Sequence, residues 1–92
     1  MEIITTMIEF RCAKANMKIQ SRSAQLFSFK AKDEKKIDIW VPQSKLIIKE
    51  DPGADDFNLC VMPKWAFYKS GNLSDNVEIV SETQHLETVE EI

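Results

Sequence analysis

Apolar and polar residues alternate through the first two thirds of this 92-residue chain. Within residues 4–12, Ile8, Phe10 and Cys12 fall on one side of an extended backbone. Glu9 and Arg11 fall on the other side, which is the pattern of a strand with one buried face. The chain is therefore expected to be mainly β. The same alternation predicts further strands around residues 17–19, 25–31, 37–41, 45–49 and 57–62.

About five to six strands in so short a chain favour a small antiparallel β-barrel or sandwich, which we assign to residues 1–73. One short helix is expected near residues 63–70, because Pro63 suits a first helical turn and Gly71 suits a helix end. A helix of two turns is not stable alone. We therefore expect Trp65 and its aromatic neighbours to anchor the helix in the core.

The charge is divided along the chain. Residues 1–72 contain all 12 Lys and Arg residues and nine of the 15 acidic residues, a net charge of 12 − 9 = +3. The remaining six acids lie in residues 73–92, which contain no base, a net charge of −6. We therefore predict an acidic, weakly structured tail over residues 74–92, with a short strand at 77–80 and then a weak helix or disorder. The division fits a polyanion-binding body, and it also fits a solvated face next to a disordered end.

The sequence contains none of the common motifs for catalysis or phosphate binding: no GxGxxG, GxxxxGK[ST], GxSxG or HExxH. Cys12, Cys60 and the single histidine, His85, are too scattered to form the close ligand pairs of a zinc site. We expect a non-enzymatic protein with no cofactor and no metal. Both cysteines are expected to be buried thiols, with one disulfide as the alternative. With no long apolar run and no signal-like N-terminus, we expect no membrane contact and a cytoplasmic location.

Two predicted strand ends combine proline with tryptophan. Residues 40–44 read WVPQS, and residues 61–65 read VMPKW, where the helix is expected to begin. Over about residues 25–73, this order of a W-V-P-x-S strand end and a V/M-P-x-W helix start resembles short proteins of unknown function encoded by bacteriophages and prophages. The chain differs from that group in its longer N-terminal strand and longer acidic tail. The resemblance implies a phage protein acting in the host bacterial cytoplasm and carries over no catalytic residue.

Trp40 is the first candidate for a recognition residue. Strand parity places it on the same face as Lys36, and a hairpin partner strand brings Lys30 to that face. An exposed tryptophan stacks a base and nearby lysines bind phosphates, as binding of single-stranded nucleic acid requires. The alternative is that Trp40 packs under the helix. The candidate nucleic-acid-binding residues are Trp40, Lys30, Lys36, Lys18 and Arg22.

The acidic tail offers a second hypothesis, in which the partner is a bacterial host protein. Carboxylates at Glu82, Glu87, Glu90 and Glu91 would present phosphate-like charge to a basic host surface, as an inhibitor or adaptor. A third hypothesis is a structural role as a homo-oligomer, since a domain of this size leaves little stability to spare. We favour single-stranded nucleic acid as the partner because residues 1–72 carry a net charge of +3. The pI of about 5.1 for the whole chain argues against strong binding.

Overall fold

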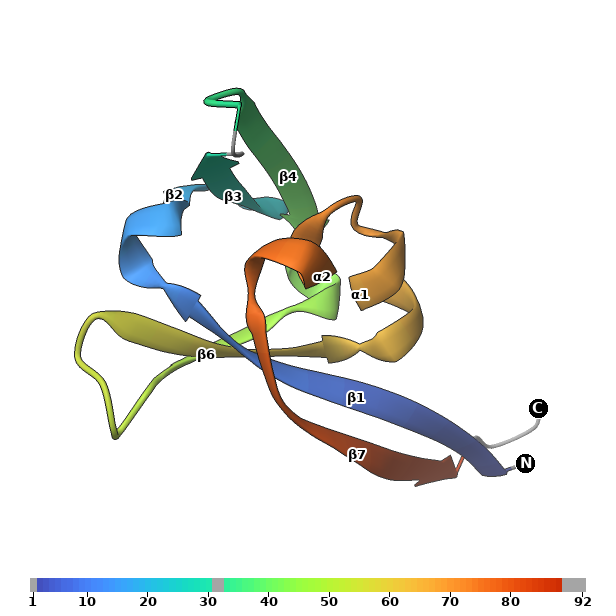
Figure 1. Cartoon of the computed structure of the whole chain (residues 1–92). Coiled ribbons are helices and arrows are strands. Elements are labelled where there is room, and N and C mark those ends of the chain that lie inside the picture. Colours follow the sequence, from blue (N-terminus) through green and yellow to red (C-terminus); the bar gives the residue numbers. More distant parts are fainter. Residues whose placement is uncertain (1, 31–32, 89–92) are drawn as a thin grey trace.

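The computed structural model describes residues 2–30 and 33–88 (Figure 1). Within them the chain forms seven strands, two short α-helices and two 3-10 turns. The strands are β1 (Glu2–Ala13), β2 (Met17–Gln20), β3 (Ala24–Lys30), β4 (Lys36–Pro42), β5 (Ile47–Glu50), β6 (Phe57–Pro63) and β7 (Glu78–Thr88). The helices are α1 (Lys64–Lys69) and α2 (Leu73–Asn76), and the 3-10 turns are η1 (Lys14–Asn16) and η2 (Gln43–Lys45).

The strands form two antiparallel sheets, one in the order β5-β6-β1-β7 and the other in the order β2-β3-β4. The mainly β prediction is confirmed, but the sheets do not close into a barrel. They remain separate because η1 carries the chain out of the first sheet and β4 pairs only with β3 among the described strands. A second helix, α2, joins the single one predicted, and its first residue, Leu73, is fully buried.

Aromatic side chains join the two sheets and α1 in one core. The ring of Phe10 on β1 lies 6.1 Å from that of Phe27 on β3 and 5.1 Å from that of Phe67 on α1, measured between centroids. All three side chains are fully buried. Burying a side chain of this size contributes about 1.5–3 kcal/mol. This contact is what holds a helix of only two turns against the sheets.

Strand β7 occupies most of the segment expected to be a weakly structured tail. It pairs with β1 from Glu2↔Thr88 to Arg11↔Glu78, with one register shift. The sequence predicts a short strand at 77–80, where β7 begins, but the capping-box pattern at residues 81–84 favours a weak helix rather than a longer strand. The structure differs because β1 supplies hydrogen-bonding partners from the other end of the chain, which local propensity cannot reveal. Residues 89–92 lie outside the described residues.

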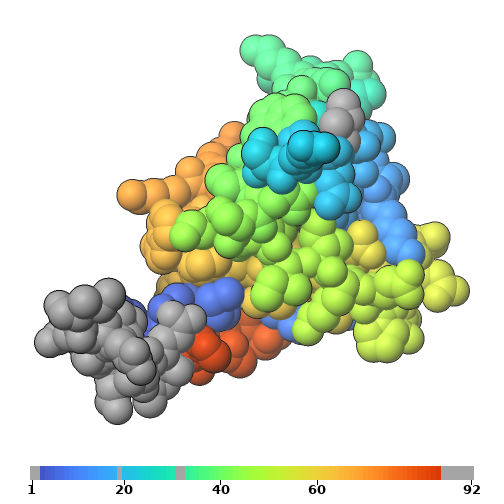
Figure 2. All heavy atoms as spheres, turned by 180° about the vertical axis from the view of Figure 1, so that it is seen from behind, coloured from blue at the N-terminus to red at the C-terminus, as the bar shows by residue number. Residues whose placement is uncertain are grey.

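The N-terminal half of β1 and the C-terminal half of β7 form a two-stranded ribbon that extends away from the rest of the molecule. It is visible in blue and red in Figures 1 and 2. Residues 2–6 of β1 pair with β7, whereas pairing with β6 begins only at Met7↔Pro63. The molecule is accordingly elongated, with extents of 50 × 27 × 24 Å. None of the helices in the described segments is both long and apolar enough to cross a membrane.

Candidate nucleic-acid interface

The outer face of the β2-β3-β4 sheet carries most of the predicted nucleic-acid-binding residues. Across β3 and β4, Leu26 lies opposite Trp40, Ser28 opposite Asp38, and Lys30 opposite Lys36. The alternate residues of β3 face inward and are buried, so these pairs face outward. We call this surface the basic sheet face. It consists of Lys18, Leu26, Ser28, Lys30, Lys36, Asp38 and Trp40.

Trp40 is 52% exposed, so it does not pack under a helix as the alternative required. Leu26 is only 7% exposed although it lies on the outer face. Leu26 lies directly opposite Trp40 in the register, and side chains at opposite positions of antiparallel strands are close neighbours. About half of the Trp40 side chain therefore remains open to solvent.

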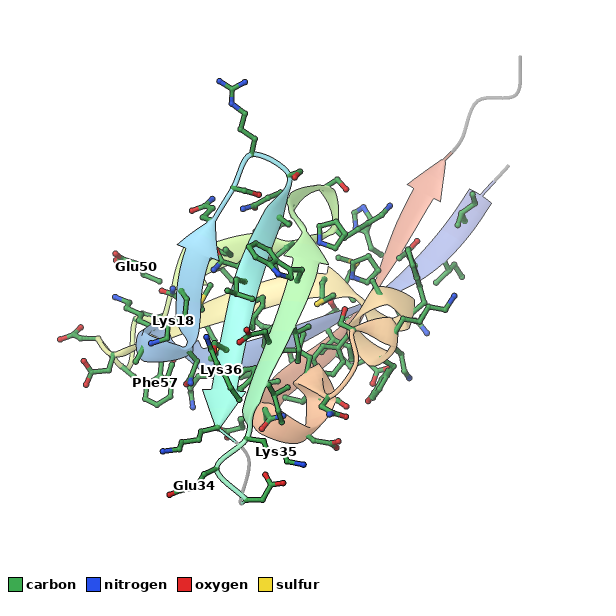
Figure 3. The ribbon with its side chains drawn as sticks, turned by 90° about the horizontal axis from the view of Figure 1, so that it is seen from above. Lys18, Glu34, Lys35, Lys36, Glu50 and Phe57 are labelled. Atoms are coloured by element: carbon green, nitrogen blue, oxygen red, sulfur yellow. The ribbon has the colours of Figure 1, made fainter. Side chains whose placement is uncertain are left out.

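Lys18 belongs to the same surface, while Arg22 does not. Met17 lies opposite the buried Phe27, so the next residue, Lys18, points outward, as Figure 3 shows on β2. Arg22 is exposed in the turn between β2 and β3, at one end of the sheet. Of the five predicted residues, the structure thus brings four to one face and places the fifth at its margin.

The basic sheet face carries more positive charge than its own acidic group neutralises. Asp38 accepts a hydrogen bond from the Ser28 hydroxyl at 2.8 Å and lies 3.7 Å from Lys36 Nζ. Lys18 and Lys30 form no ion pair with any described residue, and Lys30 lies directly opposite Lys36. Like charges at opposite positions of a sheet destabilise it slightly. A bound anion would relieve that repulsion.

A second exposed tryptophan was not anticipated from the sequence. The expectation that Trp65 anchors α1 is wrong, because Trp65 is 55% exposed. The inward face of α1 instead consists of Ala66 and Phe67, and the short helix has no second face to bury. One feature of the sequence is consistent with an exposed Trp65. Lys69 follows Trp65 by four residues, which places the two side chains on the same side of the helix.

Two lysines surround the Trp65 ring. Lys45 Nζ lies 5.5 Å from the ring centroid and Lys69 Nζ lies 5.9 Å from it, both within cation–π range. Lys45 ends η2, which directly follows β4, so the lysine that contacts the Trp65 ring lies only five residues after Trp40. That stretch spans at most about 18 Å. Seen from behind, the green segment after β4 lies beside the yellow-to-orange segment that contains β6 and α1 (Figure 2).

Of the predicted acidic protein-binding residues, Glu82 is the one whose side chain the structure describes. The Glu82 carboxylate accepts a hydrogen bond from Lys64 Nζ at 2.8 Å, which raises the pKa of Lys64. Glu87 lies on β7, but its side chain is not among those described, and Glu90 and Glu91 lie outside the described residues. Glu82 is thus engaged within its own chain.

The two cysteines and the Arg11–Asp51 pair contribute to the scaffold. Burial raises the thiol pKa of Cys12 to about 11 and that of Cys60 to about 12, so both free cysteines stay protonated and unreactive at neutral pH. Arg11 Nε contacts Asp51 Oδ2 at 2.6 Å and thereby ties β1 to the turn after β5. No three Asp, Glu, His or Cys side chains gather as metal ligands in the described parts of the chain.

No family model matches this chain, and no curated protein or solved structure matches it either. The functional argument therefore depends on the geometry of the basic sheet face.

Proposed function

We propose that the protein is a non-enzymatic module that binds single-stranded nucleic acid on its basic sheet face. The observation that carries the proposal is the half-exposed Trp40 side chain on a sheet surface that also presents three lysines. A stacked base contributes about 1–3 kcal/mol in such sites and requires no particular sequence. The resemblance to phage proteins supports an accessory role in a host bacterial cytoplasm.

The phosphates would be bound by the lysines. A phosphate near the Lys30–Lys36 pair would reduce the repulsion between two like charges that face each other across β3 and β4. The ring of Trp65 with Lys45 would provide a second stacking position along the strand. Because Asp38 lies within the same surface, we expect moderate affinity.

The test is the affinity of a labelled oligothymidine for the Trp40→Ala variant, measured by fluorescence anisotropy at low salt. Loss of one stacked base corresponds to about a 5- to 150-fold weaker Kd. The matched control is Tyr68→Ala, which removes an aromatic ring of similar exposure (51%) on α1. Trp65→Ala measures the contribution of the second stacking position.

The proposal requires a larger loss for Trp40→Ala than for the Tyr68→Ala control. Equal affinities for the Trp40→Ala variant and the wild type would remove the stacking role. Absence of any binding by the wild-type protein at low salt would refute the proposed function as a whole.

A host protein bound through the acidic segment is the second candidate, and it is favoured by the outer edge of β7. Within the described residues this edge pairs with no strand; Glu78 and Glu82 discourage pairing with a second copy but would suit an added partner strand that carries basic side chains. Deleting residues 74–92 would not test this, because it would also remove the partner strand of β1. Replacing Glu82, Glu87, Glu90 and Glu91 with Gln keeps the strand. If the variant still retains a host protein that the wild type captures, these carboxylates are not the binding determinant.

A further inference from the structure

The first half of β1 has a free edge where β6 ends. Residues 3–6 pair with β7 on one side, and no described strand pairs with their other side. All four of these residues are β-branched (Ile3, Ile4, Thr5 and Thr6). Ile3 is 42% exposed and Ile4 is 63% exposed. An uncharged, β-branched free edge readily pairs with another strand.

The other open strand edges of the described chain are protected. Natural sheets discourage pairing between molecules by placing charges or proline on edge strands, or by keeping those strands short. Residues 3–6 contain neither a charge nor a proline, and they belong to the 12-residue strand β1. The edge strands that do are β2 with Lys18, β4 with Lys36 and Pro42, the four-residue β5 with Lys49, and β7 with Glu78 and Glu82.

A groove of about 580 Å³ runs along this free edge and is closed on its other side by α1. Its walls are residues 3–6 together with Lys64, Trp65 and Tyr68. Lys64 is the only ionic residue among the described walls, and it already pairs with Glu82 of the same chain at 2.8 Å. The groove therefore favours an uncharged strand that can pair with β1 and place apolar side chains against two half-exposed aromatic rings.

Residues 3–6 of a second copy meet these requirements. We propose that two copies associate through their β1 edges, in an antiparallel two-fold arrangement with Ile4 opposite Ile4 of the second copy. In this register Ile3 of each copy lies opposite Thr5 of the other. Residues 3–6 contain no charged side chain, so no like charges face each other along this segment. Each strand then enters the groove beside α1 of the other copy. A symmetric pairing through β7 would instead bring two acidic strands together.

The expected dimer is weak. Four half-exposed side chains, Ile3, Ile4, Trp65 and Tyr68, contribute on the order of 400 Å² per copy, before any backbone contribution. The total buried area is then roughly 1,000 Å², the lower end of specific interfaces, and a micromolar or weaker Kd follows. This inference does not depend on nucleic-acid binding, because it rests on the free edge of β1; Trp65 is the one wall residue that it shares with the proposed nucleic-acid surface.

Sedimentation velocity of the full chain over a range of concentrations tests the proposal. The wild type is expected to change from monomer to dimer as concentration rises to on the order of 100 µM. Ile4→Lys places two positive charges opposite each other at the two-fold axis and is expected to weaken the dimer more than tenfold. Ile47→Lys is the matched control, since Ile47 is 59% exposed on β5 and does not line this groove.

A cysteine variant keeps the test informative if the Ile4→Lys variant folds poorly. In the proposed register, Ile4→Cys brings two thiols within disulfide distance, while the native Cys12 and Cys60 are buried. Mild oxidation is expected to link Ile4→Cys into dimers rapidly and to leave Ile47→Cys largely unlinked. A wild type that stays monomeric at the highest concentration, an Ile4→Lys dimer as stable as the wild type, or equal linking of the two cysteine variants would overturn the proposal.

Discussion

Replacing Lys30 with alanine is expected to lower the salt dependence of nucleic-acid binding by a defined amount. The basic sheet face and its margin offer four cations (Lys18, Arg22, Lys30 and Lys36), of which Lys36 is partly neutralised by Asp38 at 3.7 Å. Three to four phosphate contacts on a single strand give a slope of log K against log salt of about −2 to −3. Lys30 has no ion-pair partner among the described residues, so its removal should reduce the magnitude of this slope by about 0.7.

The assay is an oligothymidine titration at four or more salt concentrations, for the wild type and for the Lys30→Ala variant. Lys49→Ala is the matched control, because Lys49 lies on β5 of the other sheet and pairs with Glu9 at 3.0 Å. The control should keep the wild-type slope. A wild-type slope near zero, or the same decrease in both variants, would refute the assignment of the phosphate contacts to this face.

Three further predictions concern the scaffold. Phe67→Ala removes a fully buried ring that holds α1 to the core, and chemical denaturation should show a loss of about 3–5 kcal/mol in the free energy of unfolding. The pKa of Asp51 is lowered by the Gly53 backbone N–H and by Arg11, so its stabilisation is present above the ordinary pKa of about 4 and is lost as the pH falls through the lowered value. Thermal melts should therefore show a smaller acid-induced decrease in Tm for Asp51→Asn than for the wild type; equal decreases would contradict this. Cys60, whose pKa burial raises to about 12, should react with a thiol reagent only after denaturation, and rapid labelling of the native protein would exclude this burial.

The sequence predicted the strands of the body well because their signal is local. Apolar and polar residues alternate in β1, β3 and β4, which places one face of each strand in the core. A shift of one residue in the strand pairing would expose that apolar face, so the same residues that indicate a strand also fix its register. The outward position of Trp40 followed from the same parity. Its exposure did not, because exposure depends on what else packs on the outer face.

The errors concern contacts between distant parts of the chain. β7 forms because β1 lies beside it, and no property of residues 81–88 alone indicates that partner. Trp65 is expected in the core because a helix of two turns needs a buried anchor. In α1, however, Phe67 already fills the space against Phe10, and the other side of the helix stays exposed.

Chemical-shift mapping of the backbone amides during titration with oligothymidine tests the central claim most directly. The account predicts saturable shifts that are concentrated on β2, β3 and β4 around Trp40 and Lys30, extending through η2 to Trp65. Shifts confined to β7, or no shifts at a concentration at which binding is expected, would contradict it.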